Sequence, residues 1–145
     1  PVGKYQDAAG ESVCISCAVG RFNDQASQSS PWICVACAVG LYNDQVGQDA
    51  AGDCKECGNG KYNDQAAQTA ESACIDCGVG KFQDQTARTA EGACKGCAAG
   101  KYQLTTGQSS CIDCESGTYS SVGATSCSEV APSRRARRAR SDAAQ

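Results

Sequence analysis

The sequence predicts a small disulfide-rich fold, an extended tandem array of β-hairpin and turn repeats of about 20 residues with little or no helix. A segment of the form Cys-x-x-Gly-x-(Tyr or Phe) recurs, and its long copies open every 20 residues, at Cys17, Cys37, Cys57 and Cys77. The 145 residues include 13 cysteines and 16 glycines but no Met or His. With so few large apolar side chains, one large core cannot be packed, which favours a row of small stapled units.

The repeats divide the chain into three parts. Residues 1–14 form a truncated half-repeat, because Pro1 follows directly where the repeat places a cysteine, and we therefore expect a fragment of a longer protein. Residues 15–127 hold six complete cysteine-to-cysteine loops, and the composition of residues 128–145 predicts a disordered Arg/Ala-rich tail. One slot of the repeat contains every Tyr and Phe of the chain: Tyr5, Phe22, Tyr42, Tyr62, Phe82, Tyr102 and Tyr119.

Within one unit, the segment 20–25 is too short for a stable helix, since isolated helices need about 12–15 residues. Gly, Asn, Asp and Ser dominate the remainder and favour turns, so we expect short two-stranded pieces. The repeated glycine either supplies a backbone angle that other residues resist or lets the aromatic ring and the disulfide approach closely. The aromatic ring is expected to lie over the adjoining disulfide and to act as a miniature core.

The cysteine spacing allows two main interpretations, and each leaves one cysteine over. Disulfides would join the second cysteine of each Cys-x-x-Cys to the first of the next, leaving Cys14, as Cys17–Cys34, Cys37–Cys54, Cys57–Cys74, Cys77–Cys94, Cys97–Cys111 and Cys114–Cys127. Zinc ribbons would leave Cys127 and would gather the groups Cys14, Cys17, Cys34 and Cys37; Cys54, Cys57, Cys74 and Cys77; and Cys94, Cys97, Cys111 and Cys114.

The ends of the array favour disulfides. Cys14 would pair with a cysteine expected just before Pro1, and the last unit closes on the lone Cys127. A ribbon uses two cysteine pairs per metal and should impose a 40-residue alternation, which the cysteine pattern lacks. A third interpretation, that each pair is a redox motif, would need the βαβ setting that lowers a thiol pKa, and the sequence predicts none.

The repeat resembles a known family. Cys-x-x-Gly-x-(Tyr/Phe) with a closing cysteine 13 to 17 residues later is similar to the cysteine-rich repeats called ephrin type-A/B receptor-like, of the growth-factor-receptor cysteine-rich group. The opening is also similar to the first loop of tumour-necrosis-factor-receptor modules. The resemblance covers residues 1–127 and implies one disulfide per loop in an extracellular stalk, adhesion or matrix segment. It implies no kinase activity.

Charge and hydropathy limit the partners. The net charge of −3 combines −7 over residues 1–130 with +4 over residues 131–145. An acidic array lacks the basic footprint of a nucleic-acid-binding protein, and no stretch approaches the roughly 20 apolar residues of a membrane span. The basic run Arg134–Arg140 would suit a processing site or attachment to an anionic surface, but we favour a solvated tail.

Two further features have a binding and a structural interpretation. The triplets at 23–25, 43–45, 63–65 and 83–85 would supply too few carboxylates for calcium, so we expect turns capped by the Asp side chain. The repeated Gln28, Gln48, Gln68 and Gln108 are expected to be solvated or to bond such turns. Trp32 breaks the repeat and would either anchor a partner or cover its own disulfide, and we favour the second.

The sequence therefore predicts no catalytic residues, no cofactor and no metal site. We expect a secreted protein or an ectodomain that acts as a spacer, adhesion or interaction segment with protein or matrix partners. The first alternative is a ligand-binding receptor array, and the second is an intracellular zinc-ribbon protein.

Overall fold

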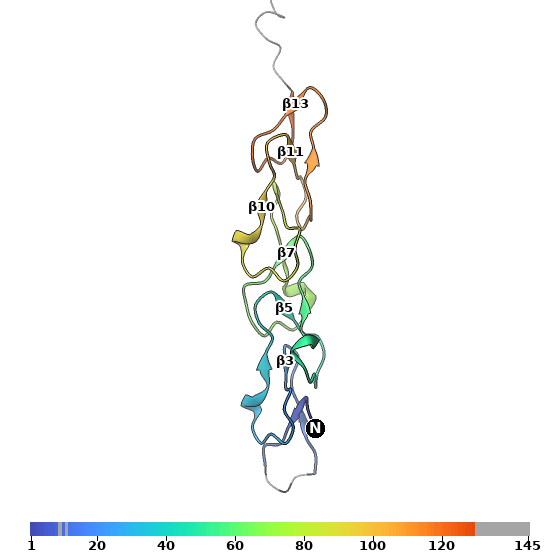
Figure 1. The fold of residues 1–145 in the computed structure, drawn as a ribbon, viewed down its shortest axis with the longest axis vertical. Helices are drawn as coiled ribbons and strands as arrows, with labels where there is room; N and C mark the ends of the chain where they lie inside the picture. The colour runs from blue at the N-terminus through green and yellow to red at the C-terminus, as the bar shows by residue number, and fades with distance from the viewer. Residues whose placement is uncertain (9, 11, 130–145) are drawn as a thin grey trace, which may run out of the picture.

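In the computed structural model, residues 1–8, 10 and 12–129 are described, and they form an elongated rod (Figure 1). Seven antiparallel two-stranded hairpins follow one another along it, with the N-terminus near one end and the last hairpin at the other. The described residues contain no α-helix. The predicted fold class is therefore confirmed.

Each hairpin pairs the two residues after the repeat glycine with the two residues after a closing cysteine. The pairs are β1 (Lys4–Tyr5) with β2 (Ile15–Ser16), β3 (Arg21–Phe22) with β4 (Val35–Ala36), β5 (Leu41–Tyr42) with β6 (Lys55–Glu56), β7 (Lys61–Tyr62) with β8 (Ile75–Asp76), β9 (Lys81–Phe82) with β10 (Lys95–Gly96), β11 (Lys101–Tyr102) with β12 (Ile112–Asp113), and β13 (Thr118–Tyr119) with β14 (Ser128–Glu129). Strand β14 lies just beyond the predicted end of the array at residue 127.

Four long loops contain a single 3-10 turn before the closing cysteine: η1 (Pro31–Ile33), η2 (Ala51–Asp53), η3 (Glu71–Ala73) and η4 (Glu91–Ala93). In each turn the cysteine N–H donates to a carbonyl three residues earlier, as Cys74 N does to Glu71 O at 2.9 Å. The turn therefore places the cysteine at the start of the returning strand.

Six disulfides close the loops: Cys17–Cys34, Cys37–Cys54, Cys57–Cys74, Cys77–Cys94, Cys97–Cys111 and Cys114–Cys127. They are the pairs favoured from the spacing, and their Cα atoms lie 5.6–5.8 Å apart, within the normal range for a disulfide. Cys14 is the free cysteine of the described residues.

Backbone hydrogen bonds interlock each repeat with the next one. Gly40 N donates to Asn63 O of the next unit at 2.8 Å, and Ala67 N of that same next unit donates back to Cys37 O at 2.9 Å. The same two bonds recur along most of the rod. The units are therefore turns of one continuous solenoid, in which backbone groups of each unit find partners in the following one.

The repeat glycine has the predicted unusual backbone angle, and the close approach that it allows is to the backbone of another unit rather than to the ring and disulfide. Gly60 has φ +80°, and a Cβ atom there would lie 2.1 Å from the carbonyl oxygen of Gly107, two units further on. A side chain at this position would thus be strained and would separate the stacked units.

Two of the aromatic rings pack on a disulfide as expected, but they do so between units, whereas Tyr119 in the last unit is exposed. Phe22 packs with the buried Cys37–Cys54 disulfide of the following unit, and Tyr42 packs with Cys57–Cys74. Each ring is only 9% exposed. The miniature core thus joins neighbouring units.

Candidate interaction surface

A column of amide side chains runs inside the rod. Asn23, Asn43 and Asn63 are at most 1% exposed, and Gln83 and Gln103 fill the same position in later units. All are hydrogen-bonded, and no buried side-chain N or O of residues 1–129, where described, lacks a partner. The interior of the array is therefore polar as well as disulfide-linked.

Each Asn of the column satisfies both ends of its amide. Asn43 Nδ2 donates to Arg21 O of the preceding unit at 3.1 Å, and Asn43 Oδ1 accepts from Gln45 N at 3.0 Å. The predicted Asp-capped turn is therefore wrong in its residue, because Asn makes the Asx turn and the following Asp is exposed to solvent. A neutral amide can donate and accept inside the rod, whereas a buried carboxylate could only accept and would lose its hydration.

The column changes character along the chain. Gln83 Nε2 donates to Ala93 O and Gln103 Nε2 donates to Ser110 O, so these longer amides bond their own loop. Ser120, which follows in the same slot, returns to the pattern of the Asn residues, since its hydroxyl donates to Lys101 O at 2.8 Å. Side-chain bonds thus join neighbouring units at Asn23, Asn43, Asn63 and Ser120.

The Gln residues at the loop ends bond turns, one of the two roles expected of them. Gln48 Nε2 donates to Gln45 Oε1 at 3.0 Å, and Gln28 makes the same bond with Gln25. The backbone carbonyl of Gln48 also accepts from Asn23 N of the preceding unit at 3.0 Å. This loop position therefore supports the stacking of the units.

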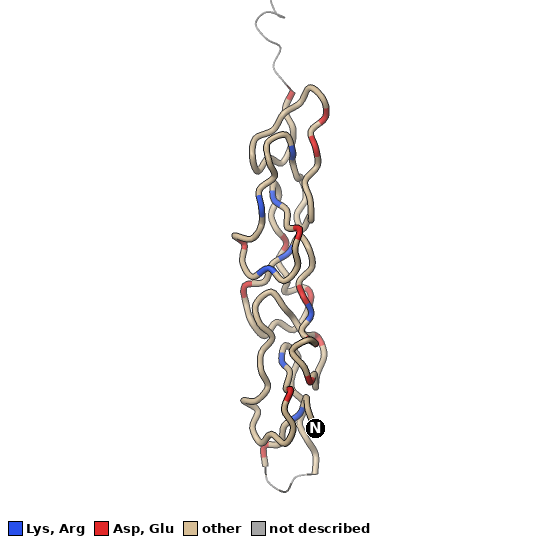
Figure 2. The backbone as a smooth tube through the Cα atoms, viewed as in Figure 1, with Lys and Arg blue, Asp and Glu red and all other residues tan. Residues whose placement is uncertain are grey.

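Ion pairs lie on the surface of the central and later hairpins. They are Lys55–Asp44, Lys61–Asp76, Lys81–Glu91, Lys95–Asp84 and Lys101–Asp113, with N–O distances of 2.6–3.0 Å. The Lys55 ammonium donates to Asp44, lowering the pKa of that carboxyl, and the same contact raises the pKa of Lys55; Lys95 lowers the pKa of Asp84. Basic and acidic residues are interspersed along the rod in Figure 2. Exposed pairs of this kind contribute little stability.

The acidic side chains do not gather around a common point. Throughout the described part of the chain, no three His, Cys, Asp or Glu side chains are placed so that they could hold a metal ion. The groups required by the zinc interpretation are divided among disulfides.

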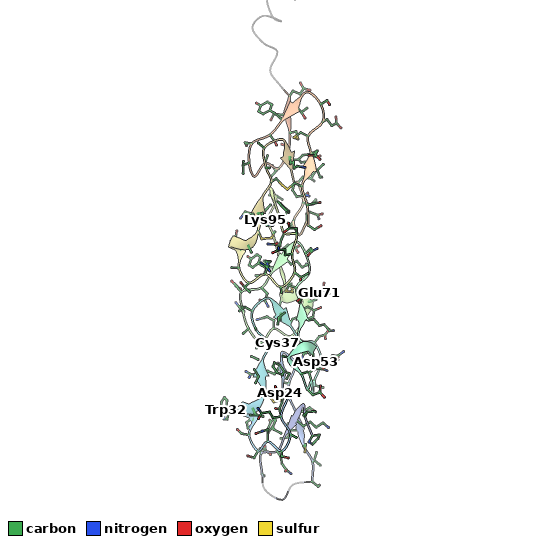
Figure 3. The ribbon with its side chains drawn as sticks, viewed as in Figure 1. Asp24, Trp32, Cys37, Asp53, Glu71 and Lys95 are labelled. Atoms are coloured by element: carbon green, nitrogen blue, oxygen red, sulfur yellow. A yellow bond between two sulfur atoms is a disulfide. The ribbon has the colours of Figure 1, made fainter. Side chains whose placement is uncertain are left out.

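Trp32 is 91% exposed, so the interpretation that it covers its own disulfide is wrong. The physical reason is the 3-10 turn η1, in which Ser30 Oγ accepts from Trp32 N at 3.4 Å. The indole points away from the rod (Figure 3). Arg21 contacts the backbone here instead, since its Nη1 donates to Cys34 O at 2.8 Å.

A surface groove of about 420 Å³ lies beside Trp32. We call it the N-terminal groove, and it is lined by Tyr5, Ile15, Ser16, Ala18, Arg21, Pro31, Trp32 and Cys34. The corresponding residues line grooves of about 440 Å³ beside Phe82 and 340 Å³ beside Tyr102. The repeat thus builds similar grooves, while the side chains around them differ.

Sequence reasoning missed Arg21. A signal was present, because Arg21 occupies the slot filled by lysine in later units, yet Ala36 faces it where Asp76 faces Lys61. Whether Arg21 faces a carboxylate depends on which residues pair across the strands, and the sequence alone did not specify this register.

No protein-family model matches the chain, and no curated protein matches it in sequence. No helix in the described residues is long and apolar enough to cross a membrane. The basic run Arg134–Arg140 lies outside the described residues.

Proposed function

We propose that this chain is a non-enzymatic segment of an extracellular protein, secreted or membrane-attached, which acts as a spacer, adhesion or protein-interaction module. The observation that carries the proposal is the interlocked stack of six disulfide-closed units. Disulfides of this density form and persist in oxidising compartments. A stack whose neighbouring units are joined by backbone hydrogen bonds also resists bending more than units joined by a linker.

The proposal accounts for the polar interior. An elongated chain cannot gather its apolar side chains into one core. Each repeat unit therefore supplies its own disulfide, aromatic ring and buried amide. Added units then lengthen the rod without enlarging a core. The resemblance to growth-factor-receptor cysteine-rich repeats supports the same role.

The disulfide state is tested on protein secreted from cells, by intact mass with and without alkylation in the absence of reductant. We expect twelve blocked cysteines and one alkylated thiol, which peptide mapping places at Cys14. Thirteen alkylated cysteines after metal chelation would refute the extracellular assignment.

The spacer role is tested by deleting one unit. Removing residues 57–76 joins Glu56 to Cys77 and preserves both the Cys-x-x-Cys and the stacking register. Fluorophores at the two ends of the array should move closer by one unit length, with the remaining disulfides intact. Removing residues 57–66 is the control, because it destroys the register. An unchanged end-to-end distance after the first deletion would contradict a rod.

A further inference from the structure

Two departures from the repeat meet at the N-terminal groove. The first is Trp32, since the other long loops have Gly52, Ser72 and Gly92 at that position. Because the indole is 91% exposed, folding buries almost none of its apolar surface. Its position is therefore not explained by a contribution to stability.

The second departure is the charge of Arg21. In two later hairpins the equivalent lysine faces a carboxylate across the strands, with 2.7 Å between Lys61 Nζ and Asp76 Oδ1 and 2.6 Å in Lys101–Asp113. Arg21 faces Ala36, and none of the ion pairs found among the described residues includes it.

The bond to Cys34 O holds the guanidinium in place but uses only one of its N–H groups. A guanidinium has five N–H donors in a planar fork. Arg21 therefore presents an oriented cation with donors to spare, next to the exposed indole.

The N-terminal groove combines these features. Tyr5, Ile15 and Pro31 supply apolar walls, and Arg21 is the only charged residue among those that line it. The volume of about 420 Å³ lies within the range of small-ligand sites. Trp, Tyr and Arg are also the side chains that most often dominate the binding energy of a protein interface.

We propose that the N-terminal groove docks an extended segment of a protein partner that places an aromatic side chain beside a carboxylate. The aromatic ring packs against Trp32 and Tyr5, and the carboxylate takes two parallel hydrogen bonds from Arg21. This inference rests on the interaction role proposed above and names the chemistry of the partner. Because residues 1–130 carry a net charge of −7, the attraction for an acidic segment at this groove comes from the local cation Arg21, which forms none of the ion pairs of the described residues.

The test uses the whole chain and three synthetic peptides: acetyl-Asp-Phe-Asp-Phe-Asp-amide, its Lys counterpart and its Ser counterpart. Trp32 is the only tryptophan, so its fluorescence reports binding directly. We expect the acidic peptide to bind most tightly, the Ser peptide less tightly and the basic peptide least. Added salt should lower the affinity of the acidic peptide and leave the affinity of the Ser peptide nearly unchanged.

Two substitutions take their residues from the repeat itself and are measured by calorimetry. Trp32→Gly should weaken binding of all three peptides, whereas Arg21→Leu, the residue at position 41, should lower the affinity for the acidic peptide at least about tenfold and abolish its advantage over the Ser peptide. Lys61→Leu is the matched control in a distant unit and should change nothing. Arg21→Lys keeps the charge without the fork and should lie between the wild type and Arg21→Leu.

Several results would overturn the proposal. They are equal binding of the acidic and basic peptides, unchanged affinity in Trp32→Gly, and a Trp32 signal that changes with protein concentration alone, which would assign the groove to a second copy. Intact mass showing six disulfides establishes that each variant is folded. Rod length in the unit-deletion experiment does not depend on the groove, so failure here is distinguishable from failure of the spacer role.

Discussion

The axis and the outer surface of the rod are built from the same repeats, yet they vary very differently. Along the axis every level has a glycine turn, a disulfide or ring, and a buried polar side chain, from Asn23 to Gln103. On the surface, the residue opposite the aromatic changes from Ile15 and Val35 to Lys55 and Lys95. The axis therefore carries stability, and the surface gives individual units separate properties.

The surface itself divides into two regions. The ion pairs found in the described chain all lie between residues 44 and 113, and two of their lysines, Lys55 and Lys95, also lie 5.9 and 5.7 Å from an aromatic ring centre. In the N-terminal groove Ile15 takes the position of these lysines, Trp32 is exposed beside it, and Arg21 forms none of the ion pairs. The central and later units pair each of their lysines with a carboxylate, whereas Arg21 of the N-terminal groove forms none of these ion pairs.

The largest effect is expected on removing a disulfide from the axis. Replacing Cys57 and Cys74 together by Ala should lower the free energy of unfolding by about 2–5 kcal/mol, because a closed loop restricts the unfolded chain. Chemical denaturation without reductant measures the change. Cys14→Ala is the control and should leave stability unchanged, since that thiol is free. Equal free energies of unfolding for the two variants would show that this disulfide does not stabilise the fold.

The stacking of units is tested by two glycines with nearly the same backbone angle. Gly60 and Gly100 have φ +80° and +81°, but only Gly60 faces a carbonyl two units on, and nothing lies within 4 Å of a Cβ at Gly100. Gly60→Ala should cost about 2–4 kcal/mol, from backbone strain and overpacking, and Gly100→Ala about 1 kcal/mol, from backbone strain alone. Equal losses in denaturant unfolding would show that close stacking does not contribute.

The amide column is tested at Asn43. Asn43→Ala leaves Arg21 O and Gln45 N without their side-chain partner and should destabilise the fold by about 2–3 kcal/mol. Asn59→Ala, at an exposed position, is the control and should have little effect. Hydrogen exchange of the Gln45 amide should accelerate in Asn43→Ala. If exchange there stays slow, the Asx turn does not depend on this side chain.

The smallest effect is expected at a surface ion pair. Folding lowers the pKa of Asp44, so its pairing with Lys55 stabilises the fold above the ordinary carboxyl pKa and is lost as the pH falls through the lowered value. The pKa of Lys55 is raised, so the contribution survives neutral pH and is lost only as the pH rises through that raised value. Lys55→Ile should flatten the acid side of the stability curve measured by denaturation across pH. An unchanged acid slope would assign it to other carboxylates.

The features that sequence reasoning predicted correctly are contacts between residues that lie close together in the sequence. Each disulfide closes a loop with a sequence separation of 13 to 17, and the period itself identifies the partners. The hairpins follow because the two strands flank the same loop. The rings over the disulfides were also predictable, since a single aromatic slot had only a disulfide to pack against.

What the sequence by itself determined is the repeat: its length, its disulfide-rich class and the local chemistry of each loop. Only the tertiary structure decided that Asn43 is buried while Asp44 is exposed, because the two are neighbours and both favour Asx turns. The stacking of three successive units encloses one of them, and an enclosed side chain must both donate and accept. The same stacking placed Trp32 and Arg21 at one groove, although neither position in the loop indicates the other. Contacts between units arise from the way the turns are superimposed, which the pattern within one turn does not contain.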